Sequence, residues 1–168
     1  KNNPSEIITV GPIESMSKSK KNTVDPEKII ENYGADAVRL FILSDSPPEK
    51  DIQWSDQGII ASYKFIQKFW SLHKKIKNKF EEDSKTENDI KLNKFTNQII
   101  YKVNQSLDRF SYNTIVASLH EIYNFYNKIT EEKLQYDNLM NNYENILKLM
   151  MPITPHLSSE CLSEISNN

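Results

Sequence analysis

The sequence predicts a mainly α-helical protein, in which a small α/β connector at the amino end leads into a bundle of four to five helices. Two observations support this fold class. Apolar residues recur at intervals of three and four over most of the chain after Pro26, which is the period of amphipathic helices. The 168 residues include only three glycines, so few flexible joints interrupt that period.

The connector is predicted over residues 1–54, and two short strands are expected in it. Residues 6–13 alternate apolar side chains with the Gly11–Pro12 pair, a pattern typical of a strand or hairpin. Residues 51–54 are expected to add a second short strand just before the bundle.

Two short helices are predicted between these strands. Asp25 and Pro26 form a helix start, because an aspartate caps the free N–H groups and a proline suits the first helical position. This helix is expected to end at Tyr33, with Gly34 as the residue after its end. The second helix follows directly and is stopped by the proline pair at 47 and 48.

The bundle is predicted over residues 55–168, where each helix carries one apolar stripe. A polar linker is expected over residues 81–89. The apolar stripes of the four long helices and of a terminal helix that restarts at Pro155 are Ile59, Tyr63, Ile66, Trp70 and His73; Leu92, Phe95, Ile99, Val103, Leu107 and Phe110; Val116, Leu119, Ile122, Tyr123 and Tyr126; Leu139, Tyr143, Ile146, Leu147, Met150 and Met151; and Leu157, Cys161, Leu162 and Ile165.

Three polar features have structural interpretations. Asp36 and Arg39 lie three residues apart on a predicted helix, the spacing of a local ion pair. His156 follows Pro155 at a helix start, which favours a capping or packing role. Cys161 has no histidine nearby in the sequence, so packing is favoured over a nucleophilic role.

Composition excludes several function classes. The formal net charge is −2, so the chain as a whole is not a basic nucleic-acid binder and any RNA affinity requires a local basic face. One cysteine excludes an internal disulfide and a cysteine-based metal cluster, so we expect a reducing cytoplasm and no metal site. No apolar run approaches the roughly 20 residues needed to span a bilayer.

Residues 14–22 read ESMSKSKKN and place hydroxyl side chains beside three lysines, directly before the predicted helix start. Hydroxyl groups and backbone N–H groups donate short-range hydrogen bonds to an anion, and a lysine brings a point charge on a flexible stem. The segment therefore predicts a phosphate-binding loop. The alternative is a solvated turn, since lysine runs are common on protein surfaces.

The order of these motifs resembles the class I aminoacyl-tRNA synthetases. SMSKSKKN at 15–22 is followed by VDP at 24–26 and by YGADAVRLFILSDSPPEKDIQWSDQG at 33–58. Within that class the SPPEKD segment, with Trp54, Ser55 and Asp56 after it, is most similar to the bacterial leucyl-tRNA synthetases. The resemblance continues through Tyr112–Thr114 and the MPITPH segment at 151–156. The family motif is written KMSKS, and Ser15 stands at its first position here.

The resemblance implies an ATP-binding loop at Ser15, Met16, Ser17, Lys18 and Ser19, which we call the signature loop. Lys18 matches the second lysine of the family motif and is the expected catalytic residue, because its charge would stabilise phosphate oxygens during adenylation of leucine. Ser17 and Ser19 are expected to shape the loop, and Met16 to anchor it by packing. Magnesium is expected to arrive with ATP.

The resemblance also implies that residues 55–168 are a helical anticodon-binding-type domain that contacts the body of tRNA(Leu). Lysines on an exposed helix face would bind RNA phosphates with little sequence readout. The densest such face comprises Lys64, Lys68, Lys74 and Lys75, continuing to Lys77 and Lys79. The alternative is a lysine-rich outer face that only keeps a helix soluble.

A class I synthetase also needs a nucleotide-binding fold with an HIGH-type motif, and none surrounds the three histidines. The chain is therefore interpreted as a carboxyl-side fragment of a cytoplasmic, monomeric ligase, inactive by itself. Two alternatives stay open: a fragment of the sister methionine, valine or isoleucine ligases, or a free-standing helical interaction module that kept a decayed loop. The SPPEKD segment argues against the sister ligases.

Overall fold

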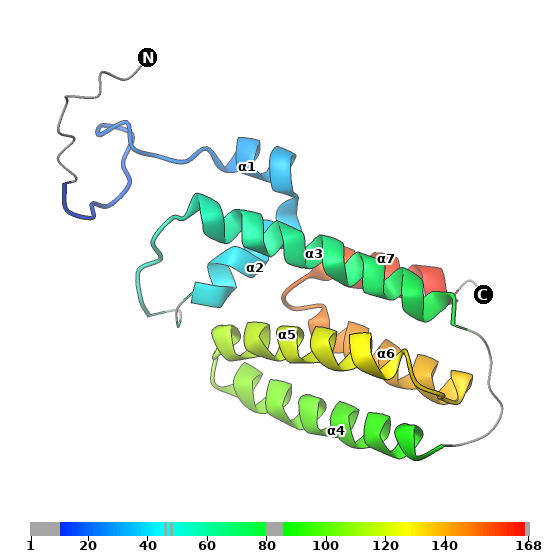
Figure 1. The fold of residues 1–168 in the computed structure, drawn as a ribbon. Coiled ribbons are helices and arrows are strands. Elements are labelled where there is room, and N and C mark those ends of the chain that lie inside the picture. Colours follow the sequence, from blue (N-terminus) through cyan, green and yellow to red (C-terminus); the bar gives the residue numbers. More distant parts are fainter. Residues whose placement is uncertain (1–10, 46, 48, 80–85, 167–168) are drawn as a thin grey trace, which may run out of the picture.

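A computed structural model describes residues 11–45, 47, 49–79 and 86–166, and over these residues the chain forms helices and loops without a strand (Figure 1). This confirms the prediction of a mainly α protein. The seven helices are α1 (Pro26–Tyr33), α2 (Ala35–Asp45), α3 (Asp56–Lys77), α4 (Glu87–Asp108), α5 (Tyr112–Ile129), α6 (Tyr136–Met150) and α7 (Pro155–Ser166).

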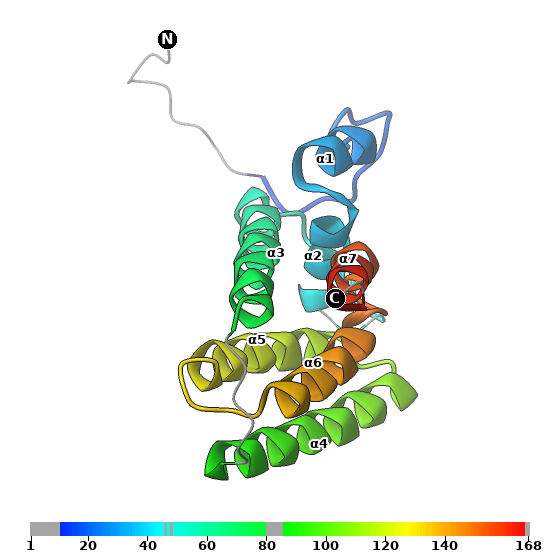
Figure 2. The same ribbon diagram turned by 90° about the vertical axis from the view of Figure 1, so that its right-hand side faces the viewer.

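The helices form two groups. Figure 2 shows α4, α5 and α6 together beneath α2, α3 and α7, with α1 at the far end. Helix α4 packs on α5 and α6, and α2 contacts α3, α5 and α7. The main core therefore lies between the groups, and Leu40 from α2 belongs to it together with Phe69 from α3.

The predicted strand at 51–54 is wrong. These residues are a loop without secondary structure, because a strand needs a neighbour for its backbone hydrogen bonds and the described residues provide none. Trp54 fixes the loop instead: its ring packs edge-on against Phe41 at 5.2 Å and its Nε1 donates to Asp56 at 2.8 Å. Of the strand predicted at 6–13, residues 6–10 lie outside the described residues and 11–13 have no secondary structure.

The two connector helices begin and end where predicted. The Asp25 side chain accepts a hydrogen bond from the N–H of Glu27 at 3.1 Å, and Pro26 starts α1. Gly34 has φ of +82° and donates its N–H to Ile30 at 2.8 Å. Residues with a side chain rarely adopt that φ. Glycine therefore allows α1 and α2 to be joined by a single residue.

The buried face of α3 is rotated from the predicted stripe. Ile59 and His73 are buried, whereas Tyr63, Ile66 and Trp70 are only half-buried. The residues that fill the core are Phe65, Phe69, Leu72 and Ile76. Because α3 is covered by α2, α5 and α7 at once, its buried arc is wider than a single stripe, and the period of the sequence does not fix where that arc is centred.

Helix α4 starts within the predicted linker. Thr86 caps it and Asp89 completes a capping box, accepting from the Thr86 N–H at 2.7 Å. Asp89 is buried rather than exposed, and its carboxylate also accepts from the N–H of Gln135 and from Asn138. Despite burial, which acts in the opposite direction, these hydrogen bonds lower the pKa of Asp89. Phe110, predicted in the α4 stripe, instead lies exposed in the α4–α5 turn.

The predicted ion pair between Asp36 and Arg39 is also wrong. Both side chains bind the corner between α6 and α7: Asp36 accepts hydrogen bonds from the start of α7, and Arg39 donates to the carbonyl groups of Pro152 and Ile153. His156 lies in this corner with Nδ1 at 2.8 Å from Asp36. Asp36 of α2, rather than His156, therefore caps the start of α7. The His156 ring contacts this capping carboxylate.

The carboxyl end of α7 is joined to α3 through Glu164. Its carboxylate binds Lys74 at 2.7 Å, and Nε2 of the buried His73 lies 3.2 Å away. These hydrogen bonds, led by the one from Lys74, lower the pKa of Glu164 to about 2. Cys161 is fully buried nearby, and burial raises the pKa of its thiol to about 12. A thiol in that state is a poor nucleophile, which agrees with its predicted packing role.

Candidate functional site

The signature loop is closed by hydrogen bonds within residues 14–22. Asn22 reaches back across it, accepting from the Ser17 N–H at 2.8 Å and donating to the Ser15 carbonyl at 3.3 Å. A turn at residues 18–21 is closed by the Lys21 N–H, which donates to the Lys18 carbonyl at 3.2 Å. Asn22 lies in the predicted loop segment, but the sequence assigned it no role; its amide orders the turn.

Ser17 lies at the centre of this turn. Its hydroxyl accepts from the Lys20 N–H at 3.3 Å and lies 3.2 Å from the Ser19 hydroxyl. Ser17 and Ser19 therefore contact each other within the loop, and Ser17 also binds the turn backbone. Met16 is 46 % exposed, so the described chain gives little for it to pack against.

The lysines of the loop have different environments. Lys20 forms an ion pair with Glu14 at 2.9 Å, which neutralises it. Lys18 is exposed at the first position of the turn, and the described residues offer it no ion-pair partner. The loop therefore presents an unneutralised charge at Lys18, beside the serine hydroxyls.

The predicted lysine face of α3 divides in two. Lys74 binds both Glu164 oxygens, at 2.7 and 2.8 Å, and lies 4.3 Å from the Trp70 ring centre. Lys75 forms an ion pair with Glu131. Lys77 and Lys79 are also engaged, by Glu164 and by backbone carbonyls of residues 130 and 132. The carboxyl half of the face is therefore committed to holding the fold together.

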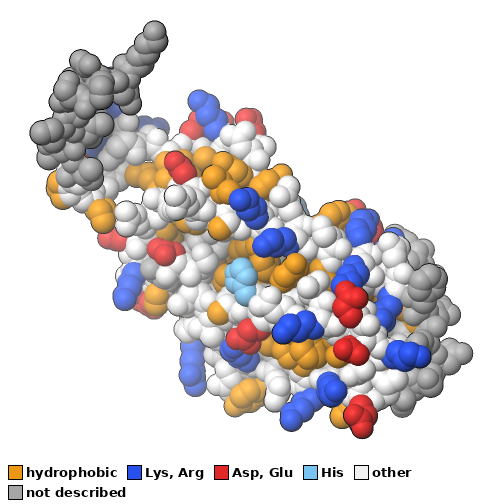
Figure 3. Space-filling model, in the orientation of Figure 1, with side chains coloured by type: hydrophobic (Ala, Val, Ile, Leu, Met, Phe, Trp, Pro, Cys, Tyr) orange, Lys and Arg blue, Asp and Glu red, His pale blue; other side chains and the backbone are white. Residues whose placement is uncertain are grey.

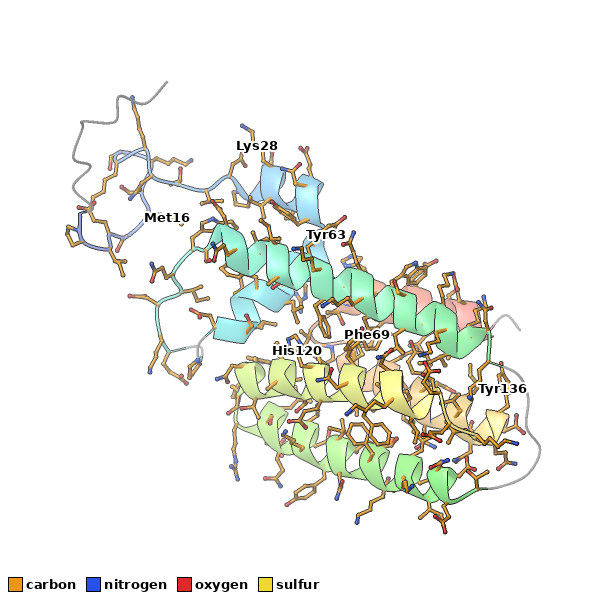
Figure 4. All side chains as sticks on the ribbon, viewed as in Figure 1. Met16, Lys28, Tyr63, Phe69, His120 and Tyr136 are labelled. Carbon is orange, nitrogen blue, oxygen red and sulfur yellow. The ribbon has the colours of Figure 1, made fainter. Side chains whose placement is uncertain are left out.

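Lys64 and Lys68 make up the other half. Both are exposed one turn apart on α3, and neither forms an ion pair within the described part of the chain. Next to them lies His120 of α5, whose ring packs on Phe65 with centroids 4.5 Å apart. Burial first, and the Lys68 charge second, lower the pKa of His120. Figure 4 labels His120 on this face, and Figure 3 shows basic side chains around a histidine there.

Sequence reasoning missed His120 because its partners lie on another helix. No motif in residues 112–129 identifies His120 as a site residue, because α3 and α5 come together only when the chain folds. We call Lys64, Lys68 and His120 the α3–α5 basic face. A histidine beside two lysines adds a donor whose charge depends on pH.

A concavity lies between the joint of α1 and α2, helix α3 and helix α7. It has a volume of about 640 Å³ and is lined mainly by apolar groups, including Tyr33, Ala37, Ile66, Trp70 and Leu157. Asp36 and His156 border it. Over the described residues, no three His, Cys, Asp or Glu side chains are grouped to hold a metal ion, and no helix combines the length and apolar content that crossing a bilayer requires.

Two family models match the chain. The model for class I tRNA synthetases of the I, L, M and V group covers residues 6–55, and the anticodon-binding domain of tRNA ligase covers residues 89–168. A leucine–tRNA ligase of Orientia tsutsugamushi (strain Boryong) is 42 % identical over 161 residues, 96 % of this chain. That of Caulobacter sp. (strain K31) is 38 % identical over 95 % of it. The chain is a homologue of leucine–tRNA ligases over nearly its whole length.

This chain spans about a fifth of the length of these ligases, 19 % in both cases. A solved LeuRS of Agrobacterium radiobacter K84, in a ternary complex with tRNA and LeuAMS, has a similar fold with a TM-score of 0.76 and 25 % identity. The match covers 88 % of this chain and 20 % of that one. The signature loop falls in the class I synthetase match, and the anticodon-binding match runs from the first turn of α4 through α7.

Proposed function

We propose that this chain supplies two parts of a leucine–tRNA ligase: the loop that binds the ATP phosphates and a helical domain that binds the body of tRNA(Leu). The complete enzyme activates leucine with ATP and transfers it to the tRNA in the cytoplasm, as a monomer. The proposal rests on the signature loop, where an unneutralised Lys18 stands on an ordered turn of hydroxyl groups.

The proposed domains are residues 1–54, which close the catalytic domain, and residues 55–168, the helical domain. The class I synthetase match ends at residue 55 and supports this boundary. Helix α2 lies on the amino side of the boundary but contributes Leu40 to the bundle core. The two parts are therefore packed as neighbours rather than joined by a free linker.

The proposed reaction requires a positively charged side chain that can reach the phosphates of ATP. The leucine carboxylate attacks the α-phosphorus of ATP, and the bond to the departing pyrophosphate breaks. Negative charge grows on the leaving oxygens, where the Lys18 ammonium would stabilise it. Magnesium would enter with ATP, held mainly by phosphate oxygens and water. Ser17, Ser19 and Asn22 would hold the turn that carries Lys18.

The RNA-binding part of the proposal concerns the α3–α5 basic face. Lys64 and Lys68 have charges free for RNA phosphates, and an RNA backbone binds such groups with little sequence readout. Lys74 and Lys75, which the resemblance assigned to the same face, hold Glu164 and Glu131. Lys74 and Lys75 would have to break these ion pairs before they could contact RNA. We therefore propose that they contribute less to tRNA binding than Lys64 and Lys68.

The test is amino-acid-dependent ATP–pyrophosphate exchange by the complete enzyme, with Lys18→Ala as the variant and Lys21→Ala as the matched control. We expect exchange with leucine, but not with isoleucine, valine or methionine. Lys18→Ala should lose about 2 to 4 kcal/mol of transition-state stabilisation, the scale of one preorganised donor. Lys21→Ala should change the rate little.

Three outcomes would contradict the proposal. Exchange with another amino acid would identify a sister ligase. No exchange with any amino acid would favour the helical interaction module. An unchanged rate in Lys18→Ala would remove Lys18 from the catalytic role.

A further inference from the structure

Two charged side chains on one face of α2 grip the corner between α6 and α7. Asp36, only 6 % exposed, accepts from the N–H of Leu157 at 2.7 Å and of His156 at 3.3 Å. Arg39 donates from Nε to the Ile153 carbonyl at 3.1 Å and from a terminal nitrogen to the Pro152 carbonyl at 2.6 Å. We call Asp36 and Arg39 the α2 clamp.

The clamp matches the charge of the corner it holds. Helix α7 begins at Pro155, which has no N–H, so the N–H groups of residues 156 and 157 are its first free donors. A carboxylate is favoured at such a helix start and a guanidinium at the end of a helix. Asp36 meets the start of α7 and Arg39 meets the chain leaving α6. The charges of Asp36 and Arg39 therefore match the α6–α7 corner when α2 lies in the orientation seen here.

The same helix holds α1, the helix that follows the signature loop in the chain. Ala37 and Phe41 of α2 form a small core with Ile59 of α3, and Ile29 and Tyr33 of α1 pack against it. Helix α1 starts four residues after Asn22, whose amide closes the turn of the loop. Figure 4 shows this order, with the loop at Met16, α1 at Lys28 and the start of α3 near Tyr63.

A continuous set of contacts thus joins α7 to α1 through α2, and the chain at residues 23–25 joins α1 to the loop. Gly34 is the single residue between α1 and α2, and its own N–H is bound to Ile30. Only residues 23–25 lie between Asn22, which closes the turn, and the start of α1. A shift of α2 against the bundle would consequently be passed on to the loop.

We propose that Asp36 and Arg39 are positioning residues for adenylation. They touch neither ATP nor leucine. They fix α2 to the α6–α7 corner, so that the loop carrying Lys18 keeps one position relative to the helical domain. This inference rests on the proposed function, because it assigns the clamp a role through Lys18.

The experiment is a double-mutant cycle in the complete enzyme, read by leucine-dependent ATP–pyrophosphate exchange well below the melting temperature of every variant. Asp36→Asn should lower kcat by roughly tenfold to a hundredfold, the cost of a small misplacement of a catalytic group, with the KM for leucine unchanged. The double variant with Lys18→Ala should lose no more than Lys18→Ala alone.

Two further variants separate positioning from general destabilisation. Arg39→Lys keeps the charge and should retain more activity than Arg39→Gln, because a lysine can still reach one carbonyl. Asp45→Asn alters an exposed carboxylate at the end of the same helix and should leave kcat unchanged.

The possible failures are distinguishable. Unchanged exchange in Lys18→Ala would overturn the proposed function and this inference with it. If Lys18→Ala abolishes exchange while Asp36→Asn leaves kcat unchanged, only the inference is overturned. Losses that multiply in the double variant would likewise overturn it, since they would show that Asp36 acts independently of Lys18.

Discussion

Lys64 and Lys74 lie on the same helix, but their ammonium groups have different surroundings. Lys74 faces Glu164 and the Trp70 ring, whereas Lys64 faces solvent. An ammonium already paired must lose that partner before it can bind a phosphate. The environment of each lysine, rather than the number of lysines, therefore decides which of them is available to RNA.

This difference predicts a salt-dependence measurement. Replacing both Lys64 and Lys68 by alanine should weaken binding of tRNA(Leu) and reduce the slope of log K against log salt by up to about 2, since each phosphate contact contributes close to one. Lys148→Ala on α6, where the lysine is paired with Glu144, serves as the control. An identical slope in the double variant and the wild type would remove the α3–α5 basic face from the interface.

At the scale of elements, α1 and α2 depend on one residue between them. Gly34 combines φ of +82° with ψ of 154°, a region that is essentially restricted to glycine. A Cβ at this position would meet no atom within 4 Å. Any cost of adding one is therefore backbone strain, without a steric contribution from neighbours.

Gly34→Ala should accordingly destabilise the protein by about 1 to 3 kcal/mol, the cost of holding a side chain in a sparsely populated backbone region. The matched control is Gly11→Ala, where a Cβ also meets nothing within 4 Å and φ is not positive; it should change stability by less than about 0.5 kcal/mol. Urea unfolding measures both. Equal effects of the two substitutions would contradict the strain argument.

At the scale of the whole molecule, the contact between α3 and α7 makes stability depend on pH. Burial lowers the pKa of His73 from its ordinary 6.5, against the opposing effect of Glu164, and Lys74 and Lys77 lower it further. The unfolded chain then binds a proton at a higher pH than the folded one. Stability should therefore be greatest above pH 6.5 and fall as the pH drops below it.

Glu164 adds a second, more acidic dependence of the same sign. Its folded pKa of about 2 lies below the ordinary 4.5, so its contribution is present above pH 4.5 and is lost as the pH falls towards 2. The two contributions begin to be lost at different pH values, near 6.5 for His73 and near 4.5 for Glu164.

The check is the free energy of unfolding measured between pH 8 and pH 5. We expect a decline below pH 6.5 that becomes shallower in His73→Gln. His120, whose pKa is also lowered, should account for part of the decline that remains. Identical pH profiles for the wild type and His73→Gln would show that His73 does not couple folding to pH.

The sequence by itself determined most of the helical elements, and it supplied the donor groups on which the proposed phosphate loop rests. Helix starts at Pro26 and Asp56, the joint at Gly34 and the apolar stripes of α5 and α6 follow from local rules of capping, backbone freedom and period. The hydroxyl groups and lysines at residues 15–21, together with the family resemblance, predict a phosphate loop, because donor types and their order can be read from the chain.

Only the tertiary structure decided which polar groups meet. Asp36 and Arg39 have the spacing of a helical ion pair, yet both bind a corner more than a hundred residues away. Lys74 and Lys75 form ion pairs with Glu164 and Glu131. His120 of α5 lies close enough to Lys68 of α3 for the lysine charge to lower its pKa. The physical reason is that local rules act over one or two helical turns, whereas a charge binds whichever partner the packing of apolar faces brings within reach.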